Sequence, residues 1–331
     1  MPATIIPGWI HARGKHCAST ALSNAMNFWG FPFSESLCAG LGSAPGFYYL
    51  KMNGTSPSKL VYTRSHVLEE NFFSSLGIPF EWTTHADGEN AITGEEKEFI
   101  REGVPLFLKV DLKYLEYYRT STSFAGHIVL NWGYDDDERN VLYGDTHFEG
   151  LQSVPYGDAS RARHARAFPS SLNGEWVPFR RPAPRPLEEA IPAALKTAVD
   201  QNLRTGSHSF GVEGMRSLAS EIHTWADAED WKWCLRFTYQ IIEKRGTGGG
   251  GFRRLYAQFL EEAARLCPKT VAPGLAERMH KIADRWTELS SALKAASEEE
   301  KPSDFSAIAG QLSLIADNEE TLFSDIASNL P

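Results

Sequence analysis

Residues 14–30 read GKHCASTALSNAMNFWG. After the cysteine, apolar side chains recur at the spacing that places them on one face of an α-helix. These side chains are Ala21, Leu22, Ala25, Met26 and Trp29. Gly30 and Pro32 follow, and both residue types commonly end helices. The pattern therefore predicts an amphipathic helix that begins at Cys17.

Cys17 occupies a position that favours the thiolate form. A helix N-terminus presents unpaired N–H groups and a partial positive charge, and Lys15 and His16 add positive potential. The chain has three further cysteines, Cys38, Cys234 and Cys267. The four cysteines form no C-x-x-C pair and no Cys/His zinc pattern. Cys17 is therefore the candidate nucleophile, and the alternative is a small buried cysteine at the start of a core helix.

His127 and Asp145 are the candidate partners of this thiol. His127 lies at the start of an expected strand, residues 126–137, and Asp145 lies near the end of the next one, residues 140–147. If the two strands are antiparallel neighbours, both side chains reach the same rim of the sheet. A carboxylate on one imidazole nitrogen would fix the tautomer and leave the other nitrogen to face the thiol. A lone histidine or aspartate at a strand end is usually a turn residue. The prediction therefore depends on Cys17, His127 and Asp145 occurring together, in this order and at these positions of the expected helix and strands.

The first half of the chain reads as a mixture of helices and strands. Helices are expected at residues 58–77 and 94–103, and strands at 104–111, 126–137 and 140–147. The last two strands form an expected hairpin across residues 135–139, and residues 151–168 read as a short strand followed by a helix. The pattern predicts an α+β domain with an antiparallel sheet.

The second half has a different pattern, and the segment 178–192 separates the two. This segment holds five prolines in fifteen residues, which is a linker composition. Beyond it the periodicity is almost wholly helical, with two shorter helices expected after Pro302. We therefore predict a catalytic domain at residues 1–182 and an all-α cap or bundle domain at residues 183–331.

Composition excludes several classes of protein. The net charge of −9 argues against a general nucleic-acid binder, which needs a basic face for phosphate contacts. The sequence contains no apolar run of 18 residues, so we predict no membrane span. The first residues lack the apolar core of a secretory signal. A cytoplasmic protein with free thiols is the expectation.

Along the chain, the candidate nucleophile Cys17 comes first, then the candidate base His127, then Asp145, which would orient the histidine. This is the order in papain-like cysteine proteases and the related bacteriocin-processing peptidases. Those peptidases carry a polar oxyanion-binding residue six positions before the nucleophile. That position is His11 here, in place of the glutamine usual in papain-like sites. An imidazole N–H could also donate to an oxyanion, and His16 is the competing donor. A purely structural His11 is a third possibility.

The chain also resembles a narrower family, that of the butirosin-biosynthesis acyltransferase BtrH. Three pairs of stretches carry the resemblance: residues 16–30 with 37–51, residues 126–137 with 143–155, and residues 214–222 with 245–264. The resemblance implies a papain-like N-terminal domain joined to a helical domain. It also implies acyl transfer from a carrier-protein thioester through Cys17 to an amine, in a natural-product pathway.

The implied partners are an acyl or peptidyl carrier protein and a small amine. No metal or other cofactor is expected, since the phosphopantetheine arm of the carrier enters as part of the substrate. Three alternatives stay open. They are a thioesterase or peptidase of the same fold, an intramolecular transfer that releases a cyclic product, and a non-catalytic binding protein.

Other segments have two interpretations each. The turn at residues 40–47, followed by Tyr48, is either a cleft wall, with Gly42, Phe47 and Tyr48 as cleft candidates, or a tight turn. The glycines of residues 246–251 lack the Gly-Lys-Ser/Thr ending of a phosphate loop, so they indicate either a close backbone approach or a plain connector. Arg180 and Arg181 belong to a basic run that could dock an acidic carrier protein, or they are solvated arginines. The run extends from Arg161 to Arg185 and comprises Arg161, Arg163, Arg166, Arg180, Arg181 and Arg185.

Overall fold

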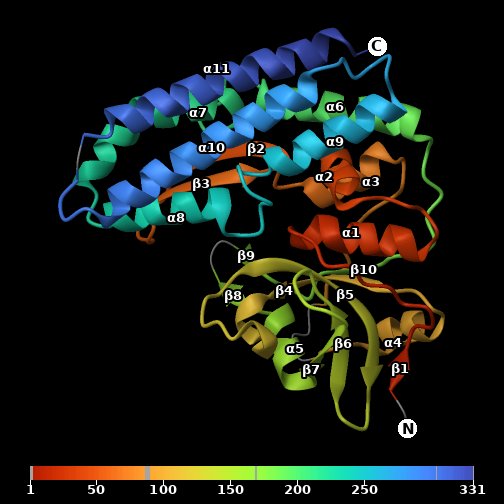
Figure 1. Ribbon diagram of the computed structural model, residues 1–331. Helices are drawn as coiled ribbons and strands as arrows, with labels where there is room; N and C mark the ends of the chain where they lie inside the picture. Colours follow the sequence, from red (N-terminus) through yellow and green to blue (C-terminus); the bar gives the residue numbers. More distant parts are fainter. Residues whose placement is uncertain (1–2, 86–89, 168–169, 303, 331) are drawn as a thin grey trace. The chain divides into compact units, whose positions relative to one another are not determined.

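A computed structural model describes residues 3–85, 90–167, 170–302 and 304–330, and the chain divides into two compact units (Figure 1). Unit 1 comprises Met1–Cys38 and Ile78–Pro184, and unit 2 comprises Ala39–Gly77 and Arg185–Pro331. One break, between Pro184 and Arg185, lies inside the expected linker. Residues 39–77 group with the C-terminal helices, which a single division at residue 182 does not anticipate.

Unit 1 contains an antiparallel sheet with the strand order β10-β4-β5-β6-β7, and the short strand β1 pairs antiparallel with residues 133 and 134 of β5. The strands are β1 (Thr4–Ile5), β4 (Leu106–Asp111), β5 (Ala125–Asp135), β6 (Asn140–Gly144), β7 (Leu151–Pro155) and β10 (Trp176–Pro178). The short strands β8 (Arg166–Ala167) and β9 (Ser170–Ser171) form a separate pair. The predicted α+β class, the antiparallel sheet and the β5–β6 hairpin are confirmed.

Helix α1 (Cys17–Phe28) begins at the predicted cysteine and packs against β5. Its apolar face is buried because Leu22, Ala25 and Met26 have no exposed surface. Gly30 ends the helix with a left-handed backbone (φ +87°), as glycine commonly does at this position. Unit 1 also holds α4 (Gly94–Arg101) and α5 (Tyr156–Arg163), both at predicted positions.

The helix predicted at residues 58–77 was wrong in its first half. Lys59–Arg64 is strand β3, which pairs antiparallel with β2 (Pro45–Lys51), and only Leu68–Ser75 is helical, as α3. Val61, Tyr62 and Thr63 are β-branched or aromatic, and such residues favour a pleated surface once a partner strand is present. Helix α2 (Glu35–Leu41) leads into this hairpin.

Six helices make up the rest of unit 2 within the described residues. They are α6 (Leu187–Asn202), α7 (Gly211–Glu221), α8 (Trp231–Glu243), α9 (Arg253–Leu266), α10 (Leu275–Glu298) and α11 (Ser306–Ser328). Helices α7 and α8 pack on β2 and β3, and α10 runs beside α8, α9 and α11 (Figure 1). Among the described residues, no helix is long and apolar enough to cross a membrane.

Two boundaries in this half differ from the prediction. The expected linker ends earlier, because α6 starts at Leu187 and includes Pro192 near its first turns. The two short helices expected after Pro302 are one helix, α11. It continues through the exposed Gly310 because buried side chains recur on one face along its whole length, from Ile308 to Ile326.

The glycine-rich segment before α9 is a close backbone approach, not a phosphate loop. Gly250 has a left-handed backbone (φ +57°), and a Cβ there would lie 2.7 Å from the Ala283 carbonyl oxygen. Arg253 follows, fully buried, and its Nη1 donates to the carbonyls of Gly46, Thr63 and Gly251 at 2.7–3.0 Å. The segment therefore joins α9 to the β2–β3 hairpin within unit 2.

Candidate active site

The start of β5 is irregular, and this irregularity orients His127. Val110 pairs with His127 but Asp111 pairs with Ala125, so Gly126 is an extra residue in β5. Gly126 has φ +111°, a backbone conformation that L side chains rarely adopt. A bulge at a strand end re-aims the neighbouring side chain, a device often found beside active sites.

Asp145 holds the imidazole of His127 from the end of β6. Nε2–H of His127 donates to both carboxylate oxygens of Asp145, at 2.9 and 3.0 Å. Both residues are almost fully buried, at 5% and 1% exposure. Asn131, the other polar candidate on β5, accepts the N–H of Gly133 instead. With Nε2 bound to the carboxylate, Nδ1 is the ring nitrogen left for the thiol.

Cys17, the first residue of α1, lies near enough to the imidazole of His127 for the two groups to interact electrostatically. Burial would raise the pKa of the Cys17 thiol, but the nearby imidazoles of His16 and His127 outweigh burial and hold the pKa well below its usual value. For His127, burial alone would lower the pKa, because it disfavours the charged ring. The interactions with Asp145 and the Cys17 sulfur outweigh burial and raise the pKa of His127 to about 10. Between these two pKa values the pair exists as thiolate and imidazolium.

Glu35, at the start of α2, organises the loop before Cys17. Its carboxylate accepts the backbone N–H groups of Lys15 (2.9 Å) and His16 (2.8 Å) and the hydroxyls of Ser19 and Thr20 (both 3.2 Å). The loop is also tied to the end of β6, because the N–H of Gly14 donates to the Thr146 carbonyl at 2.9 Å. No local pattern around Glu35 predicted this role.

The two oxyanion candidates have different surroundings. Nε2 of His11 donates to the Phe148 carbonyl (3.0 Å), and Nδ1 lies 3.3 Å from the side-chain amide nitrogen of Asn24. Burial lowers the pKa of His11, which favours the neutral ring. Nε2 of His11 thus joins the loop before Cys17 to the turn after Asp145, while Nδ1 faces Asn24 on α1. The oxyanion role of His11 stays a prediction, and it would require one of these bonds to open.

His16 is the N-cap of α1 and is 3% exposed. Its Nδ1 accepts the backbone N–H of Ser19 at 3.3 Å, so in the neutral ring the proton is on Nε2. Its backbone N–H is held by Glu35. His16 is therefore a rigid imidazole directly beside Cys17, and its oxyanion role also stays a prediction.

Two tyrosines, which sequence reasoning missed, complete the surroundings of Asp145. Tyr117 Oη donates to Oδ2 of Asp145 at 2.7 Å, and Tyr118 Oη donates to Oδ1 at 2.9 Å. Tyr118 Oη also lies 3.3 Å from Nε2 of His127. Burial would raise the pKa of Asp145, but His127 and the tyrosines outweigh it and keep the pKa below its usual value. Adjacent tyrosines in EYYRT were the only sequence signal.

The predicted cleft residues lie in unit 2, whereas Cys17, His127 and Asp145 lie in unit 1. Phe47 is 1% exposed and packs against Trp286 in the interior of unit 2, with ring centroids 6.0 Å apart. Gly42 is buried against Leu68. Tyr48 is half-buried and contacts His66 and Phe210. Only Tyr48 retains enough exposure to contact a substrate, so the cleft assignment of Gly42 and Phe47 has no support in their packing.

The predicted basic run contains arginines of two kinds. Arg163 is fully buried and pairs with Glu96, with Nη2 and Oε1 at 2.7 Å, so it belongs to the core of unit 1. Arg180 and Arg181 are exposed, and the guanidinium of Arg180 lies 4.7 Å from the centre of the Phe99 ring. Arg163 therefore has no part in the docking prediction, which names Arg180 and Arg181.

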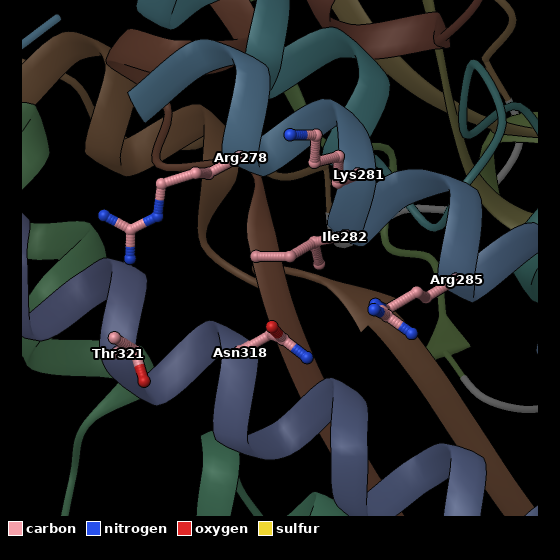
Figure 2. Close-up of a pocket in the computed structure, with 6 residues that line it drawn as sticks. All are labelled: Arg278, Lys281, Ile282, Arg285, Asn318 and Thr321. Carbon is pink, nitrogen blue, oxygen red and sulfur yellow. The ribbon is translucent and has the colours of Figure 1, made fainter. Parts of the chain in front are cut away.

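A pocket of about 160 Å³ lies between α10 and α11 (Figure 2). Its lining residues are Arg278, Lys281, Ile282, Arg285, Asn318 and Thr321. Figure 2 shows Lys281 pointing away from Asn318 and Thr321 on α11, and the guanidinium groups of Arg278 and Arg285 at opposite ends of the pocket. Arg278 pairs with Asp325 and Lys281 with Glu277. Because the cations do not converge, we assign no ligand to this pocket.

Comparison with known families covers both halves of the chain. The family model for the N-terminal domain of butirosin biosynthesis protein H matches residues 16–146, which include Cys17, His127 and Asp145. A second model, described as a domain of unknown function, DUF4872, matches residues 158–326. No curated protein matches the chain significantly. The chain therefore belongs to the BtrH-like family, and in this chain the match to the N-terminal domain of butirosin biosynthesis protein H precedes the match to DUF4872.

Proposed function

We propose that this protein is a cysteine-dependent acyltransferase of natural-product biosynthesis, which moves an acyl group from a carrier-protein thioester through Cys17 to an amine. The observation that carries the proposal is the arrangement of a low-pKa thiol, an imidazole and a buried carboxylate within unit 1. Membership of the BtrH-like family supports the biosynthetic context. A cytoplasmic location is part of the same proposal.

In the first half-reaction the Cys17 thiolate attacks the thioester carbonyl carbon. The tetrahedral intermediate collapses by breaking the bond to the pantetheine sulfur, and His127 gives its proton to that sulfur as it leaves. The products are an acyl-enzyme, a pantetheine thiol and a neutral His127. No metal or redox partner is required, because one thioester is exchanged for another.

In the second half-reaction a neutral amine attacks the acyl-enzyme, and His127 accepts the proton that the amine nitrogen loses. The bond between the acyl carbon and Cys17 breaks, which gives an amide and restores the thiolate–imidazolium pair. His127 is able to act as a base here because the acylated sulfur carries no negative charge. The interaction with the Cys17 thiolate, which helps to raise the pKa of His127, is then absent.

Intact-mass spectrometry tests this proposal directly. Enzyme incubated with an acyl-loaded carrier protein, or with an acyl-pantetheine mimic, should gain the mass of one acyl group, and the Cys17→Ala variant should gain none. Adding a competent amine should remove the group and give an amide. Rapid loss to the free acid without amide would indicate a hydrolase. Loss without an added amine, giving a cyclic product, would indicate intramolecular transfer.

Unreactive protein would contradict the catalytic proposal. If the protein takes up no acyl group and Cys17 also resists alkylation, the catalytic proposal is wrong, and the non-catalytic alternative is favoured. Unreactivity towards thioesters alone, with a reactive Cys17, would exclude only the acyl groups tested.

The carrier-docking prediction concerns the exposed pair Arg180 and Arg181. Replacing both with Glu should lower kcat/KM for a loaded carrier protein by about tenfold or more, because surface charge mainly governs encounter. Turnover of a small acyl-pantetheine mimic should stay unchanged. The matched control is Lys281→Glu with Arg285→Glu, which reverses two exposed or half-buried charges on α10. If the control variant loses carrier use instead, the docking surface includes α10.

A further inference from the structure

The segment between β4 and β5, residues 112–124, is held as a closed strap. It contains two short 3₁₀ turns, Leu112–Tyr114 and Glu116–Tyr118. Asp111, which is fully buried, closes its base: one carboxylate oxygen accepts the N–H groups of Lys113 and Phe124, both at 2.9 Å, and the other accepts the Ser123 hydroxyl. Both ends of the strap are thereby fixed to the sheet.

The strap delivers two phenols to one carboxylate. Tyr117 and Tyr118 donate to different oxygens of Asp145, at 2.7 and 2.9 Å, and both rings pack edge-on against Phe148, with centroids 4.7 and 4.9 Å away. The N–H of Phe148 in turn donates to the Asp145 carbonyl at 3.0 Å. The tyrosines therefore have fixed positions, and each competes with His127 for the charge of Asp145.

A buried carboxylate needs hydrogen-bond donors to stay ionised, since burial disfavours the charged form. Asp145 has three donor groups, the imidazole and two phenols. Burial and the nearby Asp145 charge raise the pKa of both tyrosines above the usual value, so the phenols remain protonated donors. Every hydrogen bond to a carboxylate withdraws some of its negative charge from its other partners.

We propose that Tyr117 and Tyr118 are positioning residues that act through Asp145 and limit how strongly the carboxylate retains a proton on His127. This inference rests on the proposed function, in which His127 must hold a proton for the first half-reaction and be neutral for the second. Without the phenols, Asp145 would hold the imidazolium too firmly for it to serve as a base. The strap thus tunes the aminolysis step and leaves acylation of Cys17 largely unaffected.

The first test measures the two half-reactions separately in Tyr118→Phe and Tyr117→Phe. Removing one phenol should leave the rate of Cys17 acylation within about twofold of the native rate. It should also shift the pH dependence of aminolysis by isolated acyl-enzyme to higher pH, by about half a unit to one unit. At neutral pH, aminolysis should then slow by about three- to tenfold. Tyr114→Phe is the matched control, since Tyr114 lies on the same strap but makes no hydrogen bond with Asp145 in the described residues.

A second measurement does not depend on turnover. In the Cys17→Ala protein, the titration of His127 followed by NMR reports the influence of Asp145 without the thiolate. Adding Tyr118→Phe or Tyr117→Phe should raise the His127 pKa, and Tyr114→Phe should leave it unchanged. An unchanged or lowered pKa in both phenylalanine variants would overturn the inference, even if acyl transfer is established. A raised pKa would support it, even if no acyl-enzyme can be formed.

Discussion

Replacing His127 with alanine is expected to slow the alkylation of Cys17 by iodoacetamide at pH 6 by about a hundredfold. Only the thiolate reacts, and an unassisted thiol has a pKa of about 8.5. In the variant the retained His16 still favours the thiolate, but burial opposes it. In the native protein His16 and His127 hold the Cys17 pKa well below its usual value, so the thiolate is present throughout the neutral range. The native rate should therefore change little between pH 6 and 8. The variant's rate should rise about tenfold per pH unit as the thiol ionises.

Peptide mapping of the alkylated protein checks this expectation and its specificity. Cys17 should be labelled first, because Cys38 and Cys234 have no exposed surface and burial raises the pKa of Cys234 and Cys267. His147→Ala is the control: His147 is exposed and stands two residues after Asp145, and its loss should leave the rate unchanged. A native rate in His127→Ala, or faster labelling of another cysteine, would contradict the assignment.

Replacing Glu319 with glutamine is expected to lower the free energy of unfolding by about 3–5 kcal/mol, the usual cost of breaking a buried ion pair. Glu319 and Arg253 are both fully buried, with Nε–Oε1 and Nη2–Oε2 distances of 2.8 Å. Glu319 also accepts the indole N–H of Trp286 at 2.7 Å. The variant leaves the Arg253 charge buried without its counter-ion. Urea denaturation monitored by tryptophan fluorescence measures the loss.

The adjacent Glu320 provides a closely matched control on the same helix. It pairs with Arg216 at 2.7 Å, but its side chain is 49% exposed. Exposed ion pairs contribute little because water screens them, so Glu320→Gln should cost less than about 1 kcal/mol. Arg253→Met combined with Glu319→Leu removes both buried charges and should recover much of the stability lost in Glu319→Gln. Equal losses in Glu319→Gln and Glu320→Gln would show that the buried ion pair contributes no more to the free energy of unfolding than the exposed one.

Parts of the site follow from local sequence patterns alone. The nucleophile helix was predictable because its apolar spacing and its terminal Gly30 are signals within one segment. His127 and Asp145 were predictable as neighbours because residues 126–137 and 140–147 form a hairpin, which brings the start of one strand and the end of the next to one rim. Local periodicity, short turns and the order of residues carried this information.

Other parts depend on contacts between segments distant in the chain. Glu35 lies eighteen positions after Cys17, and nothing near it in sequence indicates that its carboxylate holds the loop before the nucleophile. The two tyrosines that reach Asp145 lie on a strap whose base is closed by Asp111, and both contacts join residues far apart in the chain. Strand β3 was mistaken for a helix because Lys59–Arg64 acquires its hydrogen-bond partners from β2.

By itself, the sequence determined the nucleophile helix, the antiparallel hairpin and the identity of the three candidate catalytic side chains, since each depends on a local pattern. Only the tertiary structure decided the protonation behaviour of these side chains. The low pKa of Cys17 and the raised pKa of His127 arise from burial and from charges on other elements. It also decided that His11 is hydrogen-bonded through both ring nitrogens. Such electrostatic effects depend on distance in space, and spacing along the chain does not record that distance.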